Sequence, residues 1–390
     1  MPVSHPLRLA LICDFAEENW PSMDLVADMM MDNLRAECGS AIKVMRVRPK
    51  MVSRFGYLPA FRRSHVAYSL DRLLNRFCDY PRHLAQRKED FDLYHIVDHS
   101  YAHLVHHLPA ERSIVNCYDL DTFRCLLEPE REPRSKLFRM MTQRILDGFR
   151  RAARVICASA ATRDELLAHR LLVSDRARVI KLGIHPECAP KLGSFCDPET
   201  VRLLETQRRD HVDLLHVGTT VARKRIDVLL HVVASSRRYI PSLRLIRVGS
   251  DFTRPQQELV DRLDLKGSLL VLPFLNRRTL AAIYARAALL LQPSEREGFG
   301  LPVVEAMACG TPVVASDLPA LREMGGPSSV YCPVADVSSW TETLLELLRE
   351  RSEHPARWNA RRLAAMAWAS RFSWREHARQ TFRVYQELLH

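Results

Sequence analysis

The sequence predicts an α/β protein with two parallel β-sheets, each assembled from repeated strand–helix–strand units. Short apolar runs alternate with longer amphipathic stretches along the whole chain, which is typical of parallel sheets covered by helices. At 390 residues the chain has the length of two domains, and 47% hydrophobic residues are enough for two cores. A stretch between the halves, 185–211, lacks a hydrophobic period and is rich in turn-forming dipeptides, so we place the domain boundary there.

The apolar runs predict six strands in each half of the chain. Because βαβ crossovers are right-handed and place helices on both faces, these strands should form two parallel, Rossmann-like sheets. Those of the first half are predicted at Leu9–Cys13, Lys43–Arg48, Leu93–Val97, Ser113–Cys117, Val155–Ala158 and Arg178–Leu182. Those of the second half are predicted at Leu214–Gly218, Leu243–Gly249, Ser268–Leu272, Ala287–Gln292, Val313–Ser316 and Val330–Cys332.

The amphipathic stretches predict the covering helices. They are Met23–Cys38, Ser135–Ala153, Arg163–Arg170, Ile226–Tyr239, Pro255–Leu263 and Thr279–Ala285, and the arginine-rich stretch Arg357–His390 is also predicted to be helical. We expect a first domain at residues 1–190 and a second at 205–372.

Composition narrows the class of protein. The net charge of +11 indicates anionic partners, which leaves nucleic acid, acidic lipid and phosphorylated small molecules open, although dispersed Arg-Arg pairs argue against a nucleic-acid stripe. The ten cysteines form no Cys-x-x-Cys pair, which favours reduced thiols. No apolar run approaches the roughly 20 residues of a membrane span, and no signal-peptide pattern precedes the first strand. A cytoplasmic location is therefore predicted.

The most informative segment is Pro293–Ser316, which reads as a glycine loop, a helix and a strand. Gly298 and Gly300 let a ligand approach the backbone closely. Two carboxylates frame the turn, with Glu297 in the loop and Glu305 in the helix. A helix N-terminus attracts anions, and carboxylates accept hydrogen bonds from hydroxyls. The pattern therefore fits an anion flanked by two polyols, as in a nucleotide diphosphate sugar.

The segment His216–Asp227 repeats this design, with a strand end, a small-residue loop and paired cations at the start of a helix. Arg223 and Lys224 can hold a diphosphate and neutralise the charge on a departing nucleotide. An ordinary basic turn at the surface is the alternative interpretation.

With these two motifs, the chain resembles the retaining glycosyltransferases of family 4, which have the GT-B fold. Glu297–Glu305 matches the Glu-x7-Glu element of that family, and Gly218-Thr219 with Arg223-Lys224 resembles its Gly-Thr-x3-Arg-Lys-Asn variant. The resemblance spans nearly the whole chain and is most specific in the second half. It implies two Rossmann-like domains facing across a cleft, with Phe372-Ser373-Trp374 leading a C-terminal helix, about 375–390, back to the first domain.

The resemblance also implies roles for individual residues. Glu297 would bond hydroxyls of the transferred sugar, Glu305 would bind the ribose diol, and Arg223 and Lys224 would grip the diphosphate. The backbone around Pro273-Phe274 would border the base. The donor-binding residues implied in this way are Gly218, Thr219, Phe274, Glu297, Gly298, Phe299, Gly300, Leu301 and Glu305.

The first half departs from the family pattern. The loop after the first strand, Asp14–Met23, is acidic and lacks the usual Gly-Gly pair, which should change the access of the acceptor. Tyr118-Asp119 stands where the family has His-Asp, so Tyr118 could supply a hydroxyl instead, or His99 could take the place near the donor. Asp119 could orient its loop or act directly. The predicted catalytic residues are Glu297, Arg223, Lys224, His99 and Asp119.

Two patterns have alternative interpretations. His99 and His103 would share a helix face, as zinc ligands can, but we favour a single histidine facing the substrate and expect no metal. The stretch Arg134–Arg154 is basic and amphipathic, with Leu137 and Phe149 on its apolar side. It could lie on an anionic membrane, as a peripheral contact at the inner surface, or pack on the core with a solvated basic edge.

We therefore predict an enzyme that transfers a hexose from a nucleotide diphosphate sugar to an acceptor hydroxyl, on a glycan or lipid-linked sugar, with retention of the anomeric configuration. Neither a metal nor another cofactor is expected. The alternatives are a nucleotide-sugar epimerase or a phosphorylase of the same fold, a catalytically degenerate nucleotide-sugar-binding protein, and a nucleic-acid binder.

Overall fold

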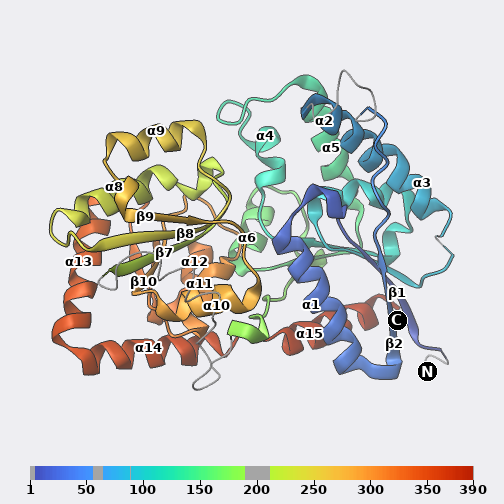
Figure 1. Cartoon of the computed structure of the whole chain (residues 1–390). Coiled ribbons are helices and arrows are strands. Elements are labelled where there is room, and N and C mark those ends of the chain that lie inside the picture. The colour runs from blue at the N-terminus through green and yellow to red at the C-terminus, as the bar shows by residue number, and fades with distance from the viewer. Residues whose placement is uncertain (1–4, 56–64, 88, 189–210, 390) are drawn as a thin grey trace. The chain divides into compact units, whose positions relative to one another are not determined.

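The computed structural model describes residues 5–55, 65–87, 89–188 and 211–389, and the chain divides into two compact units. Unit 1 comprises Met1–Gly183 and Trp374–His390, and unit 2 comprises Ile184–Ser373. Each unit consists of one sheet with helices packed on its faces (Figure 1). The boundary predicted within 185–211 lies outside the described residues, except for 185–188 and 211.

The sheet of unit 1 has six parallel strands in the order β2-β1-β3-β4-β5-β6. The strands are β1 Leu7–Ile12, β2 Ile42–Val47, β3 Leu93–Ile96, β4 Ser113–Cys117, β5 Arg154–Cys157 and β6 Ala177–Val179. All six predicted strands are confirmed within a few residues. The chain passes from β1 to β2 on one side and then to β3 on the other, so a topological switch point lies between β1 and β3.

The helices of unit 1 cover both faces of this sheet. They are α1 Pro21–Cys38, α2 His65–Leu74, α3 Tyr80–Ala85, the 3-10 helix η5 His99–His107, α4 Arg124–Leu127, α5 Lys136–Arg151, α6 Ala160–Ala168 and α15 Trp374–Leu389. Two of them begin earlier than predicted because local residues favour it. Pro21 suits the first turn of α1, and Ser159 caps α6 by accepting a hydrogen bond from the Thr162 N–H at 3.1 Å. α2 and α3 had no counterpart in the sequence prediction.

The C-terminal helix α15 completes unit 1 by packing against α1. Its Tyr385 hydroxyl lies 2.6 Å from Nδ1 of the buried His95 in β3. Arg375 and Arg379 both pair with Glu37 at the end of α1, at 2.6 and 2.8 Å. The last helix of the chain is therefore part of the first unit's core.

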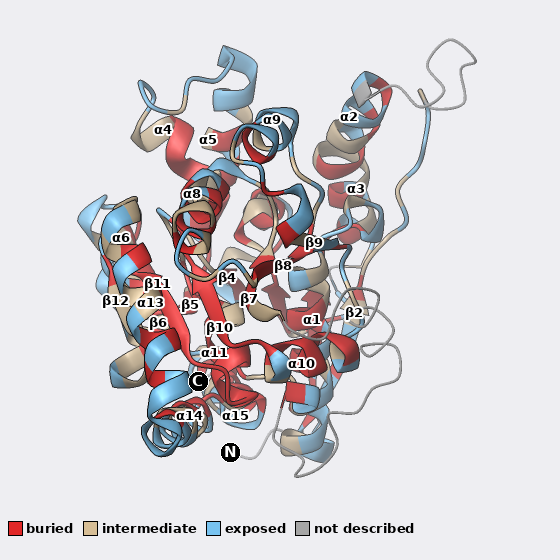
Figure 2. Cartoon of the chain, turned by 60° about the vertical axis from the view of Figure 1, so that its left-hand side comes forward, coloured by how far each residue is buried: buried red, intermediate tan, exposed pale blue. Residues whose placement is uncertain are grey.

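The sheet of unit 2 is also parallel, in the order β12-β11-β10-β7-β8-β9. Its strands are β7 Val212–Gly218, β8 Leu243–Gly249, β9 Leu269–Leu272, β10 Leu289–Gln292, β11 Val313–Ser316 and β12 Val330–Cys332, and they confirm the six predictions. The helices are α8 Ile226–Arg237, α9 Arg254–Arg262, α10 Arg277–Arg286, α11 Leu301–Ala308, α12 Pro319–Gly325, α13 Val337–Glu353 and α14 Pro355–Ala369. Most residues of the central strands are buried in Figure 2, because helices cover both faces.

Two bulk predictions can be compared with the described residues. The nine cysteines among them are all free thiols, as expected. Of the described helices, none combines the length and the apolar character needed to pass through a bilayer.

Candidate functional site

The two signature motifs of unit 2 lie at its topological switch point, between β7 and β10. β7 ends at Gly218, and the loop that starts at Thr219 leads into the 3-10 turn Ala222–Lys224, while the loop after β10 leads to α11. The two loops are joined by a hydrogen bond from the Glu295 N–H to the Arg223 carbonyl at 2.8 Å. Parallel α/β sheets bind their ligands at such a point, beyond the carboxyl ends of the strands.

Glu297 is the centre of this site. Its carboxylate pairs with the ammonium of Lys224 and with the guanidinium of Arg223, the latter at 3.3 Å. It also accepts hydrogen bonds from Gln292 Nε2 at 2.6 Å and Ser294 Oγ at 2.8 Å. Burial would raise the pKa of Glu297, but the charges of Lys224 and Arg223 lower that pKa to about 2. Glu297 is therefore ionised at neutral pH and serves as a hydrogen-bond acceptor, not as an acid.

The helix α11 begins beside this carboxylate. Its N-cap, Gly300, has a φ of +90°, and a Cβ at this position would lie 2.8 Å from Leu321 Cδ2. The positive φ favours glycine here, and any other residue would also have to displace the end of the Leu321 side chain. Phe299 is buried and its ring meets that of Phe372 edge to face, with centroids 6.0 Å apart. Gly298 is buried, and Leu301 is the first residue of the helix, whose N–H groups carry a partial positive charge.

Glu305 lies further along α11 and is buried. It accepts a hydrogen bond from the Tyr284 hydroxyl at 3.1 Å and pairs with Arg277 at 3.3 Å. Burial raises the pKa of Glu305, although Arg277 opposes this shift. Phe274, which was predicted to border the base of the donor, follows β9 at the edge of the sheet and is exposed.

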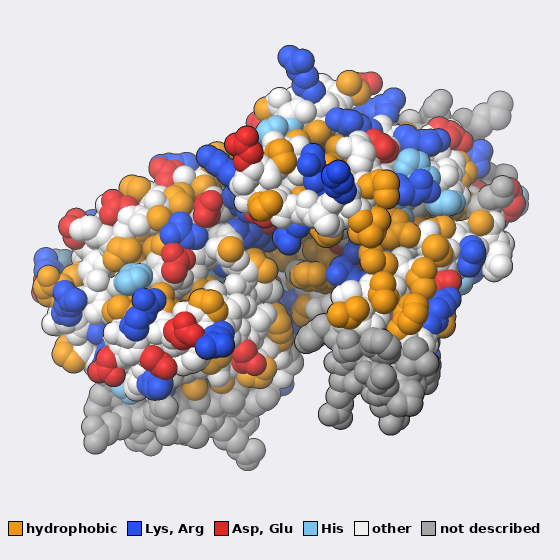
Figure 3. Space-filling model, turned by 90° about the horizontal axis from the view of Figure 1, so that it is seen from above, with side chains coloured by type: hydrophobic (Ala, Val, Ile, Leu, Met, Phe, Trp, Pro, Cys, Tyr) orange, Lys and Arg blue, Asp and Glu red, His pale blue; other side chains and the backbone are white. Residues whose placement is uncertain are grey.

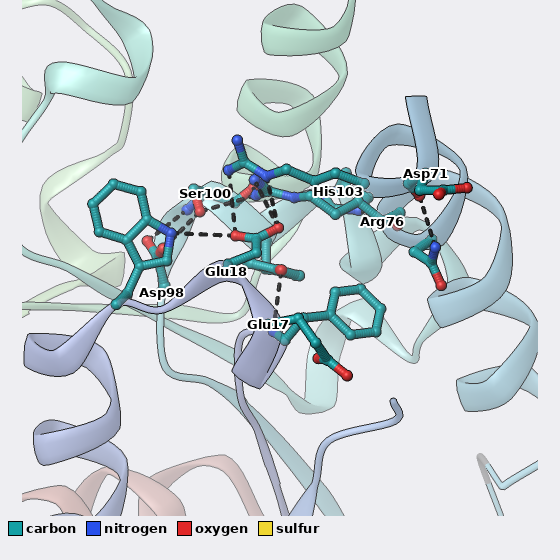
Figure 4. A network of polar contacts seen from close by, with 12 residues as sticks. Glu17, Glu18, Asp71, Arg76, Asp98, Ser100 and His103 are labelled. Carbon is teal, nitrogen blue, oxygen red and sulfur yellow. Dashed lines mark hydrogen bonds and ion pairs between the residues drawn. The ribbon is translucent and has the colours of Figure 1, made fainter. Parts of the chain in front are cut away.

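The acidic loop after β1 in unit 1 is fastened to the first helices of that unit (Figure 4). Glu18 pairs with Arg72 of α2 at 2.9 Å and lies 3.7 Å from Arg76. The Glu17 carbonyl accepts a hydrogen bond from the Tyr68 hydroxyl at 3.0 Å. Arg76 also donates to the Ser100 carbonyl at 2.6 Å. A glycine loop would lack the Glu18 carboxylate and could not form the ion pairs with Arg72 and Arg76.

Acidic side chains gather at the switch point of unit 1, where Asp14 follows β1 and Asp98 follows β3. Asp14 is buried, and its carboxyl oxygens have no donor partner among the described residues. Burial and the neighbouring charge of Asp98 raise the pKa of Asp14 well above its usual range. Asp98 is half-buried, which would raise its pKa, but His99 and hydrogen bonds from Ser100 lower that pKa below its usual range. Asp14 therefore keeps its proton to a higher pH than Asp98 does.

His99 and Asp119, the two catalytic predictions in unit 1, lie close together. His99 Nε2 is 3.8 Å from Asp119 Oδ1, and its Nδ1 is 3.4 Å from Asp98 Oδ1. Neither ring nitrogen has a hydrogen-bond partner among the described residues. Asp119 accepts a hydrogen bond from the Asp121 N–H at 3.0 Å, which holds its loop. The hydroxyl of Tyr118 donates to the Val97 carbonyl at 2.8 Å and so is engaged within unit 1.

The histidine pair does not form the helix face predicted from the sequence. His99 and His103 lie on a 3-10 helix, where residues four apart do not share a face. His103 instead lies 2.8 Å from the Arg76 carbonyl and stacks on Phe77. In the part of the chain that the structure describes, no group of three or more His, Cys, Asp or Glu residues could hold a metal ion.

Several contact residues were missing from the sequence prediction. Gln292 and Ser294 bind Glu297, while Tyr284 and Arg277 bind Glu305. One signal was present for Gln292, because it is the polar end of an otherwise apolar strand. The only sequence signal for Asp14 was its position after the first strand, and the partners of Glu305 had no sequence signal.

Two family models match the chain in succession. The one described as Glycosyltransferase Family 4 matches residues 44–187, and the one described as Glycosyl transferases group 1 matches residues 205–362. The chain belongs to the group 1 glycosyltransferases. This glycosyltransferase is 29% identical over 343 residues to O-antigen chain mannosyltransferase B of Escherichia coli. The matched region covers 86% of this chain and 84% of the relative. It is 32% identical over 251 residues to a D-inositol 3-phosphate glycosyltransferase of Frankia alni, across 61% and 60% of the two chains.

Solved structures share the fold of the glycosyltransferase. Sucrose-phosphate synthase from Thermosynechococcus elongatus matches with a TM-score of 0.72 at 20% identity, over 98% of this chain and 99% of the other. The Anabaena protein Alr3699/HepE, solved in complex with UDP-glucose, matches with a TM-score of 0.72 at 15% identity, over 98% and 100%. The GT-B fold predicted from the sequence is confirmed.

Proposed function

We propose that this glycosyltransferase moves a hexose from a nucleotide diphosphate sugar to an acceptor hydroxyl, with retention of the anomeric configuration and without a metal or other cofactor. The observation that carries this proposal is the group formed by Arg223, Lys224 and Glu297 in front of the N-terminus of α11. Two cations and a helix N-terminus suit a diphosphate, and an ionised carboxylate suits sugar hydroxyls.

The chemistry asked of these residues is positioning and charge stabilisation. As the bond from the sugar to the diphosphate weakens, negative charge grows on the phosphate oxygen, and Arg223 and Lys224 would stabilise it. Glu297 would orient the sugar by accepting hydrogen bonds from its hydroxyls. The acceptor hydroxyl would attack from the face that the leaving group departs, and its proton would pass to the departing phosphate, which accounts for retention without a protein nucleophile.

The comparisons support the class of substrates. The Anabaena structure is titled as a complex with UDP-glucose, and the Escherichia coli relative is named for the O-antigen chain. We therefore propose a nucleotide-sugar donor and a glycan or lipid-linked acceptor. We further propose a cytoplasmic enzyme in peripheral contact with an anionic membrane.

A ligand panel tests the donor. UDP, GDP and ADP sugars should each be added to the purified protein, and one of them should raise its melting temperature, since binding to the folded state stabilises it. Transfer from that donor should proceed in excess EDTA, and NMR should show the product anomer to match the donor. Release of free nucleotide without transfer would instead indicate the epimerase. Transfer to inorganic phosphate alone would indicate the phosphorylase.

A further inference from the structure

Two buried side chains at the switch point of unit 1 lack hydrogen-bond partners. Asp14 lies just after β1 and is 3% exposed, and His99 lies just after β3 and is 4% exposed. Among the described residues, neither the carboxyl oxygens of Asp14 nor the ring nitrogens of His99 have a hydrogen-bond partner. Burying a polar group without a partner costs free energy, so such groups are expected where a ligand or an ordered water completes the contacts.

Two partly exposed carboxylates flank His99. Its Nδ1 lies 3.4 Å from Asp98 Oδ1, and its Nε2 lies 3.8 Å from Asp119 Oδ1. The side chains of Asp98 and Asp119 are 14% and 25% exposed, so a ligand can reach them from solvent. Even a protonated His99 would be outnumbered by these two carboxylates. We refer to Asp14, Asp98, His99 and Asp119 as the acidic edge.

The arginines near the acidic edge are held by other carboxylates. Arg72 and Arg76 lie 2.9 and 3.7 Å from Glu18, as Figure 4 shows for Glu18 and Arg76. Arg48, whose charge also acts on this region, pairs with Asp24. A phosphate at the acidic edge would therefore meet carboxylates and would have to compete with a carboxylate for each of these arginines.

The acidic edge also differs in charge from the protein as a whole. The chain carries a net charge of +11, and Figure 3 shows Lys and Arg side chains dispersed over the face seen from above. An anionic ligand is therefore attracted by the protein in general and repelled at this position. Such a local repulsion is one way in which a binding site rejects a close analogue of its ligand.

An exposed aromatic ring lies in the same loop as Asp14. Trp20 is 44% exposed, and its indole N–H donates a hydrogen bond to Glu18 Oε2 at 3.3 Å. Glu18 lies beside Arg76, which donates to the Ser100 carbonyl at 2.6 Å, so the indole is tied to the segment that follows β3. A flat aromatic ring offers apolar surface to the C–H face of a sugar, and carboxylates accept hydrogen bonds from its hydroxyls.

We propose that the acidic edge and Trp20 bind an uncharged sugar ring of the acceptor and reject a phosphorylated one. The proposal rests on the function proposed above and names the class of its acceptor. Asp98 and Asp119 accept hydrogen bonds from hydroxyls of this sugar, and Trp20 packs against its C–H face. A phosphate on the same sugar would be repelled by both carboxylates.

Saturation-transfer NMR of the full chain tests this preference without a donor. Mannose and myo-inositol are compared with mannose 6-phosphate and inositol 3-phosphate. The Lys224→Ala protein is measured in parallel, because the cations of unit 2 could bind a phosphate on their own. Each neutral sugar should bind about tenfold more tightly than its phosphate ester, since each of the two carboxylates repels a phosphate by about threefold.

Variants of the acidic edge locate the preference. Asp98→Asn and Asp119→Asn should each narrow the ratio of the two affinities about threefold, because each removes one repelling charge. Trp20→Ala should weaken the binding of both classes of sugar about fivefold and leave their ratio unchanged, because it removes only the stacking surface.

The matched controls are Asp147→Asn and Phe138→Ala, because both residues are exposed on α5 of the same unit. Phe138 follows Leu137, which the sequence placed on the packed side of this helix but which is exposed. Both controls should bind the sugars like the unchanged protein, and every variant should keep its melting temperature.

Three results would overturn the inference. They are equal or tighter binding of the phosphate esters by the Lys224→Ala protein, binding of neither class of sugar, and an unchanged affinity ratio in both Asp98→Asn and Asp119→Asn. Failure of the proposed function would look different, because no nucleotide sugar would then raise the melting temperature in the ligand panel, whichever sugars bind.

Discussion

The two units place opposite chemistry at equivalent positions of the same fold. At the switch point of unit 2, Glu297 is held by Lys224 and Arg223, which lower its pKa to about 2. At the switch point of unit 1, Asp14 lies beside Asp98, and burial raises its pKa. The fold therefore fixes where a ligand is expected, whereas the side chains decide which ligand fits. A cation-rich edge suits a diphosphate, and an acid-rich edge suits the hydroxyls of a neutral sugar.

The largest effect should come from removing a cation of unit 2. Lys224→Ala should lower turnover by about 10²–10³-fold, as expected for the loss of a donor that stabilises transition-state charge. Glu297→Gln should have a comparable effect, because it removes the negative charge that pairs with Lys224 and Arg223 and replaces one acceptor oxygen with an N–H donor. Steady-state kinetics with the donor found in the ligand panel measures both.

The control for this pair is Lys266→Ala, because the Lys266 side chain is exposed in the same unit and pairs only with Asp261 in the contacts described. It should leave turnover unchanged. Near-normal turnover by a folded Lys224→Ala variant would show that the Lys224 cation does not stabilise the leaving diphosphate.

The second effect concerns the backbone in front of α11. Gly300→Ala should destabilise unit 2 by roughly 1–3 kcal/mol, because alanine at a φ of +90° is strained and its Cβ meets Leu321. Gly267→Ala is the matched control, since a Cβ there meets nothing within 4 Å. Thermal melting compares the two. If they melt alike, the turn is not a structural constraint.

The third prediction sets the pH dependence of the two units against each other. Glu297 has a lower pKa in the folded protein than in the unfolded chain. Its carboxylate therefore stabilises the fold above about pH 4.5, and this contribution is lost as the pH falls toward 2. Raising the pKa of Asp14 has the opposite sign, so its contribution is present below its ordinary value of 3.8 and is lost as the pH rises through the raised value. The free energy of unfolding should be measured with urea across a pH series. Glu297→Gln should remove its rise between about pH 2 and 4.5, and Asp14→Asn should remove its fall above pH 3.8. Identical pH profiles for the two variants would contradict the contrast.

The smallest effect concerns the contact between α15 and the sheet of unit 1. Tyr385→Phe removes the hydroxyl that lies 2.6 Å from the buried His95 and should cost about 1 kcal/mol. Tyr239→Phe should cost nothing measurable, because Tyr239 is largely exposed. Donor binding should be unchanged in both. A loss of donor affinity in Tyr385→Phe would show that the two units are not energetically separate.

The strands and the unit 2 motifs were predictable because their signals are local. A buried parallel strand is a continuous apolar run, and the Glu297–Glu305 segment combines a strand end, glycines and a helix start within a few residues. The contacts in unit 1 were not predictable in this way. Asp14 and Asp98 are separated by most of a domain in sequence, and only the strand order brings them together. α2 was missed although Val66, Leu70 and Leu74 recur every four residues, which is a helical spacing.

The return of α15 to the first unit has a consequence for biosynthesis. A ribosome delivers this helix after every strand of the second unit has emerged, so the surface of α1 that α15 covers stays exposed on the nascent chain until then. Cutting the chain after Ser373 would remove α15 and so destabilise unit 1, whereas unit 2, which ends at the cut, would keep all its elements. Fusion partners or degradation tags appended behind Leu389 would act on the earliest-synthesised half of the enzyme.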